Sequence, residues 1–165
     1  IRINGRCIHY GCFTRRFCNY IKRTYAMISI EDKILNYKEN LDSFDDSMEK
    51  YKFLLDQGKK IEAFPEEYRQ DSFKVSGCQA QVWLVPYVKD KKIFFHFDSD
   101  AFISKGMITI LCDIYGGREP KEIISTNFDL LEKLELNNLL TPSRRNGVHS
   151  MLMKIKEYAK AYHKN

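Results

Sequence analysis

The chain has 165 residues, of which 44% are hydrophobic and 30% are charged, as in an ordinary soluble globular domain. No run approaches the ~20 apolar residues that a membrane-spanning helix needs, which excludes a membrane-spanning protein. The net charge is +5, but residues 1–30 alone carry six arginines and lysines and no acid, which leaves −1 for residues 31–165. The body of the chain is nearly neutral, so its charge does not support a nucleic-acid-binding function.

Residues 1–30 form a basic leader without a periodic apolar stripe. Such a composition is typical of an organelle import segment, although a disordered basic tail is the alternative. The leader begins with Ile and not Met, so we expect further residues to precede it. Its three cysteines, Cys7, Cys12 and Cys18, are not spaced as the C-x-x-C pairs of a zinc site, and we interpret them as incidental. We therefore predict a disordered or transit-derived leader at 1–30 and one folded domain at 31–165.

The first predicted element of the domain is a long helix. Apolar residues recur at steps of three and four over residues 34–55, which predicts a single helix of about six turns. Ser29 and Asp32 resemble a capping box at its start. Gly58 stands where a left-handed helix end is expected.

A β-hairpin is predicted next. Residues 59–77 lack a period and indicate an exposed connection. Two alternating apolar stretches then predict an antiparallel hairpin over residues 79–97, with its turn at residues 89–92. Pro86 should lie at a strand end or at a sheet edge, because proline cannot donate to a strand ladder.

Helices follow the hairpin to the end of the chain. The stretch DSDAFISKGMITILCDIYGG predicts a buried helix with Asp98 and Asp100 as N-terminal caps and Gly106 at a close contact with a neighbour. Two short helices are predicted after Pro120. A last helix should begin at Thr141-Pro142. This order predicts a single α+β domain in which helices pack on one face of a small antiparallel sheet.

Two cysteines lie in the predicted domain. Cys112 falls on the buried helix and is interpreted as structural. Cys78 lies where an aperiodic loop meets the first strand and follows Gly77, which removes side-chain bulk and leaves the backbone mobile. From this position alone, a buried structural thiol and a reactive thiol remain equally open. A thioredoxin-type dithiol is disfavoured, since no second cysteine lies close in sequence.

Three stretches, VSGCQAQVWLV, DSDAFISKGMITIL and LTPSRRNGVHSMLMKI, together resemble the SufE family of cysteine desulfuration proteins in order and spacing. The resemblance covers roughly residues 32–163. It implies an α+β fold similar to SufE and to iron–sulfur scaffold proteins. It also implies that Cys78 accepts a sulfane sulfur from a pyridoxal-phosphate (PLP)-dependent cysteine desulfurase of SufS type. The acceptor stimulates that enzyme and passes the sulfur to a scaffold of SufBCD type.

The same resemblance implies supporting roles for residues near Cys78. Asp100 is expected near the cysteine at the partner surface. Arg144 is expected either to pair with an acidic group of the desulfurase or only to stabilise the start of its own helix. Gln79 and Gln81 are expected to hydrogen-bond around the loop. No metal and no cofactor of its own are expected, since PLP belongs to the desulfurase.

Two other functions remain as alternatives. An iron–sulfur cluster scaffold needs three or four soft ligands, but the predicted domain has two cysteines. An independent cysteine hydrolase could use Cys78 with His96 or His149 as base, although no oxyanion-hole motif is evident. The basic leader favours a plastid-type organelle, an apicoplast or chloroplast, with the mitochondrion or cytoplasm as alternatives.

Overall fold

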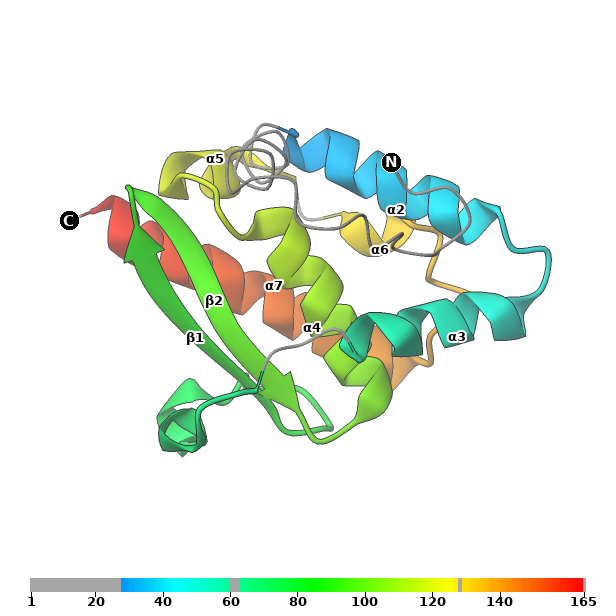
Figure 1. Cartoon of the computed structure of the whole chain (residues 1–165), viewed down its shortest axis with the longest axis horizontal. Coiled ribbons are helices and arrows are strands. Elements are labelled where there is room, and N and C mark those ends of the chain that lie inside the picture. The colour runs from blue at the N-terminus through cyan, green and yellow to red at the C-terminus, as the bar shows by residue number, and fades with distance from the viewer. Residues whose placement is uncertain (1–27, 60–62, 128, 165) are drawn as a thin grey trace, which may run out of the picture.

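The computed structural model describes residues 28–59, 63–127 and 129–164. The predictions for residues 1–27, which include Cys7, Cys12 and Cys18, lie outside the described residues. The described chain is an α+β domain, as predicted, with helices packed on one face of a two-stranded antiparallel sheet (Figure 1). None of the described helices is both long enough and apolar enough to cross a membrane.

Two helices replace the single long one that was predicted, so that prediction was wrong. Helix α2 spans Ile30–Asp42 and α3 spans Ser47–Gly58. The break has a local cause, because the Asp46 carboxylate accepts a hydrogen bond from the Met48 backbone amide and starts a new helix. The predicted capping box of Ser29 and Asp32 is confirmed. It places Ser29 and Ile30, which were assigned to the leader, in the folded domain.

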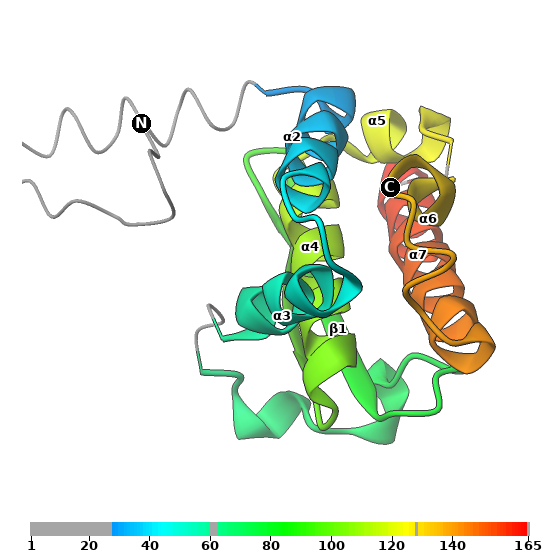
Figure 2. The ribbon, with the colours of Figure 1, turned by 90° about the vertical axis from the view of Figure 1, so that its right-hand side faces the viewer.

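Helix α4, Phe102–Tyr115, is the central helix and packs against α2, α3, α7 and the sheet (Figure 2). A Cβ atom on Gly106 would lie 2.0 Å from the Leu54 carbonyl oxygen, which confirms the predicted close packing at this glycine. On the opposing helix, a Cβ on Gly58 would lie 3.0 Å from the Gly106 nitrogen. Gly58 therefore serves helix contact, and it is not the left-handed helix end that was predicted, since the described glycines with positive φ are Gly77 and Gly117.

The hairpin consists of β1, Val82–Lys89, and β2, Lys92–Ser99. The turn is where it was predicted, and its two central residues, Asp90 and Lys91, both have positive φ, as a tight hairpin turn requires. Pro86 pairs with Phe95, and in a sheet of two strands its missing N–H can face away from the ladder.

The segment before the hairpin covers the sheet face opposite the helices. It contains two short 3₁₀ turns, η1 at Glu66–Tyr68 and η2 at Asp71–Phe73. Arg69 from this segment lies over the Trp83 ring and pairs with the buried Asp98 carboxylate. Lys105 of α4 also pairs with Asp98. Asp98 is therefore not the helix cap that was predicted: the N-cap of α4 is Ala101, without a side-chain cap.

Three helices complete the domain. The short helices α5, Pro120–Ser125, and α6, Leu130–Lys133, are followed by α7, Pro142–His163. Helix α7 begins with Thr141 as N-cap and Pro142 as first residue, as predicted, but the Thr141 side chain makes no capping hydrogen bond. The Tyr158 hydroxyl of α7 donates to the Leu84 carbonyl of β1. This contact joins the later turns of α7 to the sheet, while Gly147 near the start of α7 contacts Cys78 in the loop before β1.

Candidate functional site around Cys78

Cys78 lies in a loop, residues 76–81, that precedes β1. The backbone amide of Val75 donates to the Val82 carbonyl, with an N–O distance of 2.9 Å, and closes the base of the loop. Gly77 has φ +84°, and a Cβ there would lie 2.6 Å from the Ser150 hydroxyl oxygen of α7. Glycine is therefore favoured by the backbone conformation, and a Cβ at this position would also force the Ser150 hydroxyl to turn away.

The Cys78 thiol is half-buried against the first turns of α7. Its sulfur donates a weak hydrogen bond to the Gly147 carbonyl, with an S–O distance of 3.4 Å. A Cβ on Gly147 would lie 3.6 Å from the same sulfur, in ordinary van der Waals contact with it, so the first turns of α7 pack closely against the thiol. Burial raises the pKa of Cys78 to about 11. The thiol is therefore protonated in the resting protein.

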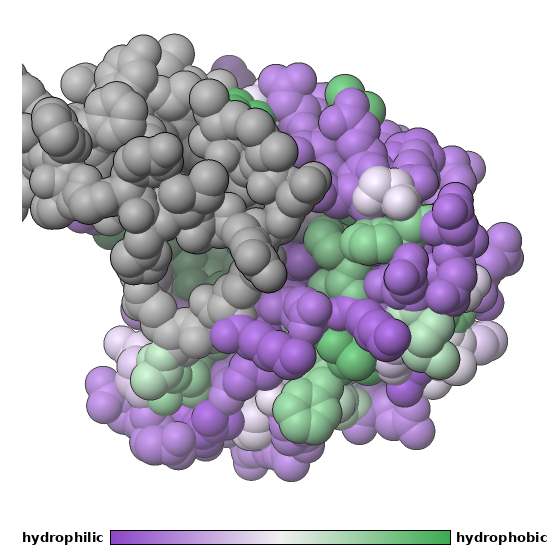
Figure 3. Space-filling model, turned by 45° about the vertical axis from the view of Figure 1, so that its right-hand side comes forward, coloured by the Kyte–Doolittle hydropathy of each residue, from purple (hydrophilic) through white to green (hydrophobic). Residues whose placement is uncertain are grey.

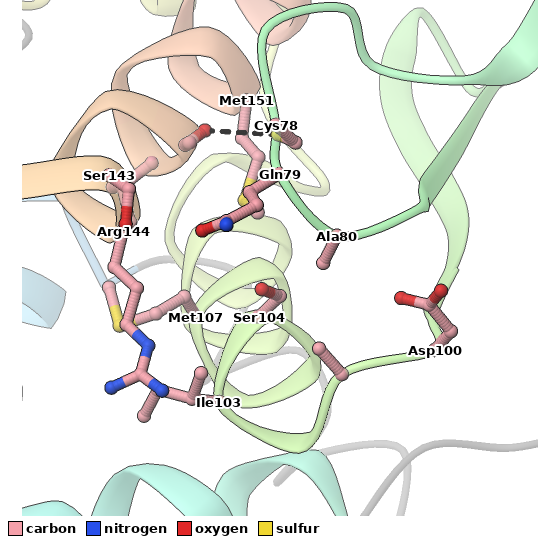
Figure 4. A pocket seen from close by; sticks show the side chains of 13 residues that line it. Cys78, Gln79, Ala80, Asp100, Ile103, Ser104, Met107, Ser143, Arg144 and Met151 are labelled. Carbon is pink, nitrogen blue, oxygen red and sulfur yellow. Dashed lines mark hydrogen bonds between the residues drawn. The ribbon is translucent and has the colours of Figure 1, made fainter.

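A cavity of about 340 Å³ opens beside the thiol (Figure 4). It is bounded by the Cys78 loop, the start of α4 and the start of α7, three segments that are far apart in sequence. Its wall combines apolar and polar side chains: Ala80, Ala101, Ile103, Met107, Val148 and Met151, and Gln79, Asp100, Ser104, Ser143 and Arg144. The cavity gives the sulfur an apolar side and a polar, solvent-exposed side.

Asp100 lines this cavity and holds the loop. Its carboxylate accepts a hydrogen bond from the Gln81 backbone amide at 2.9 Å, and its own amide donates to the Gln81 carbonyl at 3.2 Å. The Ser99 hydroxyl donates to the same carbonyl. Because these bonds occupy the backbone of Gln81, the strand begins at Val82 and not at residue 79 as predicted. Asp100 is thus a support of the loop and not a cap of α4.

The other predicted site residues lie around the same loop. The Gln79 side chain is exposed and lines the cavity, while Gln81 is tied through its backbone. Arg144 reaches the cavity from α7, and its guanidinium lies over the Tyr51 ring, 5.7 Å from the ring centre. The structure therefore places Arg144 on the wall of the Cys78 cavity, 66 residues further along the chain.

Sequence reasoning missed Gly147 and Ser99. The Gly147 carbonyl accepts the hydrogen bond of the thiol, and the Ser99 hydroxyl is a second tie of the loop. A glycine inside an otherwise helical pattern is a signal for close approach, and that signal could have identified Gly147. Ser99 had no comparable signal, because its role depends on the path of the loop.

The alternative sites are less well supported. Within the described ranges, no three His, Cys, Asp or Glu side chains are grouped so that they could hold a metal ion. The histidines considered as a hydrolase base do not line the cavity: His96 stacks on Tyr87, with ring centres 4.6 Å apart, and His149 is exposed on α7. Cys78 has no histidine base beside it in the described structure.

Comparisons with known proteins agree with this geometry. The family model SufE, described as an Fe-S metabolism associated domain, matches residues 36–159. A protein of Wigglesworthia glossinidia brevipalpis named "Cysteine desulfuration protein SufE" is 36% identical over 132 residues, covering 78% of this chain and 90% of the relative. An uncharacterised SufE-like protein of Synechocystis is 34% identical over 137 residues, covering 83% and 86%.

A solved structure is similar in fold. It is a hypothetical protein from Thermus thermophilus with a TM-score of 0.67 and 18% identity, and the match covers 81% of this chain and 97% of that one. At this identity the likeness supports the α+β fold alone. The family model and the curated relatives, which span most of the chain, identify this protein as a member of the SufE family.

Proposed function

We propose that this protein is a sulfur carrier that receives a sulfane sulfur on Cys78 from a PLP-dependent cysteine desulfurase of SufS type. It accelerates that enzyme by removing its persulfide, and it delivers the sulfur to an iron–sulfur scaffold of SufBCD type. One observation carries the proposal: the Cys78 thiol lies at a solvent-open cavity, on a loop held by a few hydrogen bonds at its base.

The transfer is a thiol–persulfide exchange. The Cys78 thiolate attacks the outer sulfur of the desulfurase persulfide, a new S–S bond forms on Cys78, and the bond to the desulfurase cysteine breaks. That cysteine leaves as a thiolate and takes up the proton that Cys78 released. The sulfane sulfur moves between two thiols, so no oxidant or reductant is needed.

The geometry of Cys78 in the resting protein is better suited to shielding the thiol from oxidation than to attack on a persulfide. With a pKa of about 11, roughly one Cys78 in a thousand is a thiolate at pH 8. Since oxidation follows thiolate character and exposure, this burial shields the sulfur between transfers. The partner must then draw the loop out of its seat on α7, which lowers the pKa by returning the thiol to water. The positive φ of Gly77 marks the position where the loop can pivot.

The proposal assigns the carbon–sulfur chemistry to the desulfurase and its PLP, and no cofactor to this chain. Arg144, exposed at the cavity, supplies a positive charge for an acidic group of the partner. A plastid-type location remains part of the proposal. It depends on the composition of residues 1–27, which lie outside the described structure.

The decisive experiment is intact-mass measurement after incubation with a SufS-type desulfurase and L-cysteine. Wild type should gain one or more sulfur atoms that a reductant removes, and Cys78→Ser should gain none. Cys112→Ser is the matched control and should behave as wild type. An unmodified wild-type protein that leaves the rate of the desulfurase unchanged would falsify the carrier function. Turnover of a thioester or amide without any partner would instead favour the hydrolase.

A further inference from the structure

Phe102, the first residue of α4, is 82% exposed. It follows Asp100 and Ala101, two residues of the Cys78 cavity, directly in sequence. A phenylalanine side chain this exposed adds little to the core, and its contact with water is unfavourable. Figure 3 shows hydrophobic residues exposed among hydrophilic ones on the side of the molecule where α3 lies. The placement of Phe102 beside a reactive thiol suggests a contact with another protein.

Phe102 lies on the wall of a second cavity of about 820 Å³, which we call the Phe102 groove. Helix α3 forms one wall with Tyr51, Lys52 and Leu55, and the start of α4 forms the other with Phe102 and Ile103. Arg144 of α7 also lines the groove. Ala101, Ile103 and Arg144 also line the Cys78 cavity. The groove is therefore continuous with the site of transfer, and a segment bound in it is held beside the thiol.

The groove presents a particular chemistry. Lys52 and Leu55 of α3 and Lys59 directly after it line the groove at steps of three and four, so this side of the groove combines basic and apolar side chains. Lys59 pairs with Asp56, while Lys52 and Arg144 add positive charge at the groove. An apolar side chain flanked by carboxylates complements this surface.

We propose that the Phe102 groove is the docking surface for an acidic, apolar-anchored segment of the cysteine desulfurase, with Phe102 as the residue that gives affinity and partner choice. This inference rests on the proposed function. An aromatic side chain that becomes buried at the centre of an interface typically contributes much of the binding energy, and surrounding charges guide association. A partner bound in the groove would leave the Cys78 loop free to enter the partner's active site, because Phe102 lies on α4 and Cys78 lies on the separate loop before β1.

The test is the affinity of full-chain variants for the PLP-loaded SufS-type desulfurase of the same organism. Phe102→Ser should raise Kd about 10-fold or more, as expected for loss of a buried aromatic anchor. Leu35→Ser is the matched control: Leu35 is 53% exposed on α2, outside the groove, and its variant should bind as wild type. At saturating desulfurase, Phe102→Ser should still acquire a persulfide on Cys78 at close to the wild-type rate, which also shows that it is folded.

A charge reversal tests complementarity separately. Lys52→Glu should raise Kd about 5-fold, and added salt should reduce the difference from wild type. Lys50→Glu, on the same helix but outside the groove, is the matched control and should have a smaller effect. Equal Kd values for Phe102→Ser, Lys52→Glu and wild type would overturn the inference.

The outcomes separate the inference from the function on which it rests. Wild type that acquires a persulfide, together with groove variants that bind as wild type, overturns the docking surface alone. Wild type that binds the desulfurase but acquires no sulfur overturns the carrier function, while a weaker Phe102→Ser still supports the docking surface. Self-association that Phe102→Ser abolishes, without a change in Kd, would assign the groove to a second copy of this chain and overturn the inference.

Discussion

Cys78 and Cys112 are the two cysteines of the described structure, and they have the same chemistry in different surroundings. Cys112 lies on the central helix with 7% of its surface exposed, and Cys78 lies half-buried in a loop at a cavity. Burial raises the pKa of both thiols, to about 11 for Cys78 and well above the usual value for Cys112. The thiol pKa in the resting protein therefore does not distinguish Cys78 from Cys112.

Mobility and access distinguish the two instead. To expose Cys112, α4 would have to leave its contacts with α2, α3, α7 and the sheet, which amounts to unfolding the core. To expose Cys78, the loop must lose the weak bond to Gly147 and the ties of Gln81 to Asp100 and Ser99. Under the proposed function, the Cys78 thiol would be held in its protonated form at rest and released by a local change.

The largest expected effect is the difference in alkylation between the two cysteines. With iodoacetamide at pH 8, Cys78 should react at least ~100-fold faster than Cys112 in the native protein, because local opening costs less than global opening. Peptide mass spectrometry resolves the two sites from Cys7, Cys12 and Cys18. In denaturant the two rates should converge. Similar rates in the native protein would contradict the comparison.

The pH dependence of Cys78 sharpens the comparison. A thiol reacts as its thiolate, and burial holds the pKa of Cys78 at about 11. Its alkylation rate should therefore keep rising about tenfold per unit between pH 8 and pH 10, whereas an exposed cysteine levels off near its ordinary pKa of about 8.5. Circular dichroism over the same range checks that the fold is retained. A plateau of the rate below pH 9 would show that the thiol is not buried in solution.

The smallest expected effect comes from removing the hydrogen bond between the Gln81 amide and the Asp100 carboxylate. Asp100→Ala removes the acceptor of the Gln81 amide and should raise the alkylation rate of Cys78 about 3- to 10-fold by favouring loop opening. Asp100→Asn keeps an acceptor oxygen but removes the charge, so it should have little effect. A matching rise for Asp100→Asn would attribute the change to charge and not to the tie.

Asp113→Ala is the control in the other region. Asp113 follows Cys112 and binds Lys33 and Tyr37 of α2, far from the Cys78 loop in the fold. Its loss should leave the rate of Cys78 unchanged. A rise equal to that of Asp100→Ala would mean that the two regions open together.

Several features of the fold could be predicted from local sequence patterns. The capping box at Ser29, the turn at residues 89–92 and the start of α7 at Pro142 depend on neighbouring residues, so they could be predicted. The single helix over residues 34–55 was a wrong prediction of the same kind. Its apolar spacing continues across residues 43–46, while the capping bond of Asp46, a stronger local effect, interrupts the helix.

By itself, the sequence determined the class of fold, and it singled out Cys78 as the candidate reactive residue, since the stretch around Cys78 resembles a family signature. The tertiary structure decided what surrounds that thiol. Gly147, Asp100 and Arg144 line the cavity beside it from positions that are 69, 22 and 66 residues away in the chain. Their roles depend on how α4 and α7 pack against the hairpin. The exposure of Phe102 depends on which face of α4 is buried in the core. Such contacts depend on packing between distant segments, which no local pattern encodes.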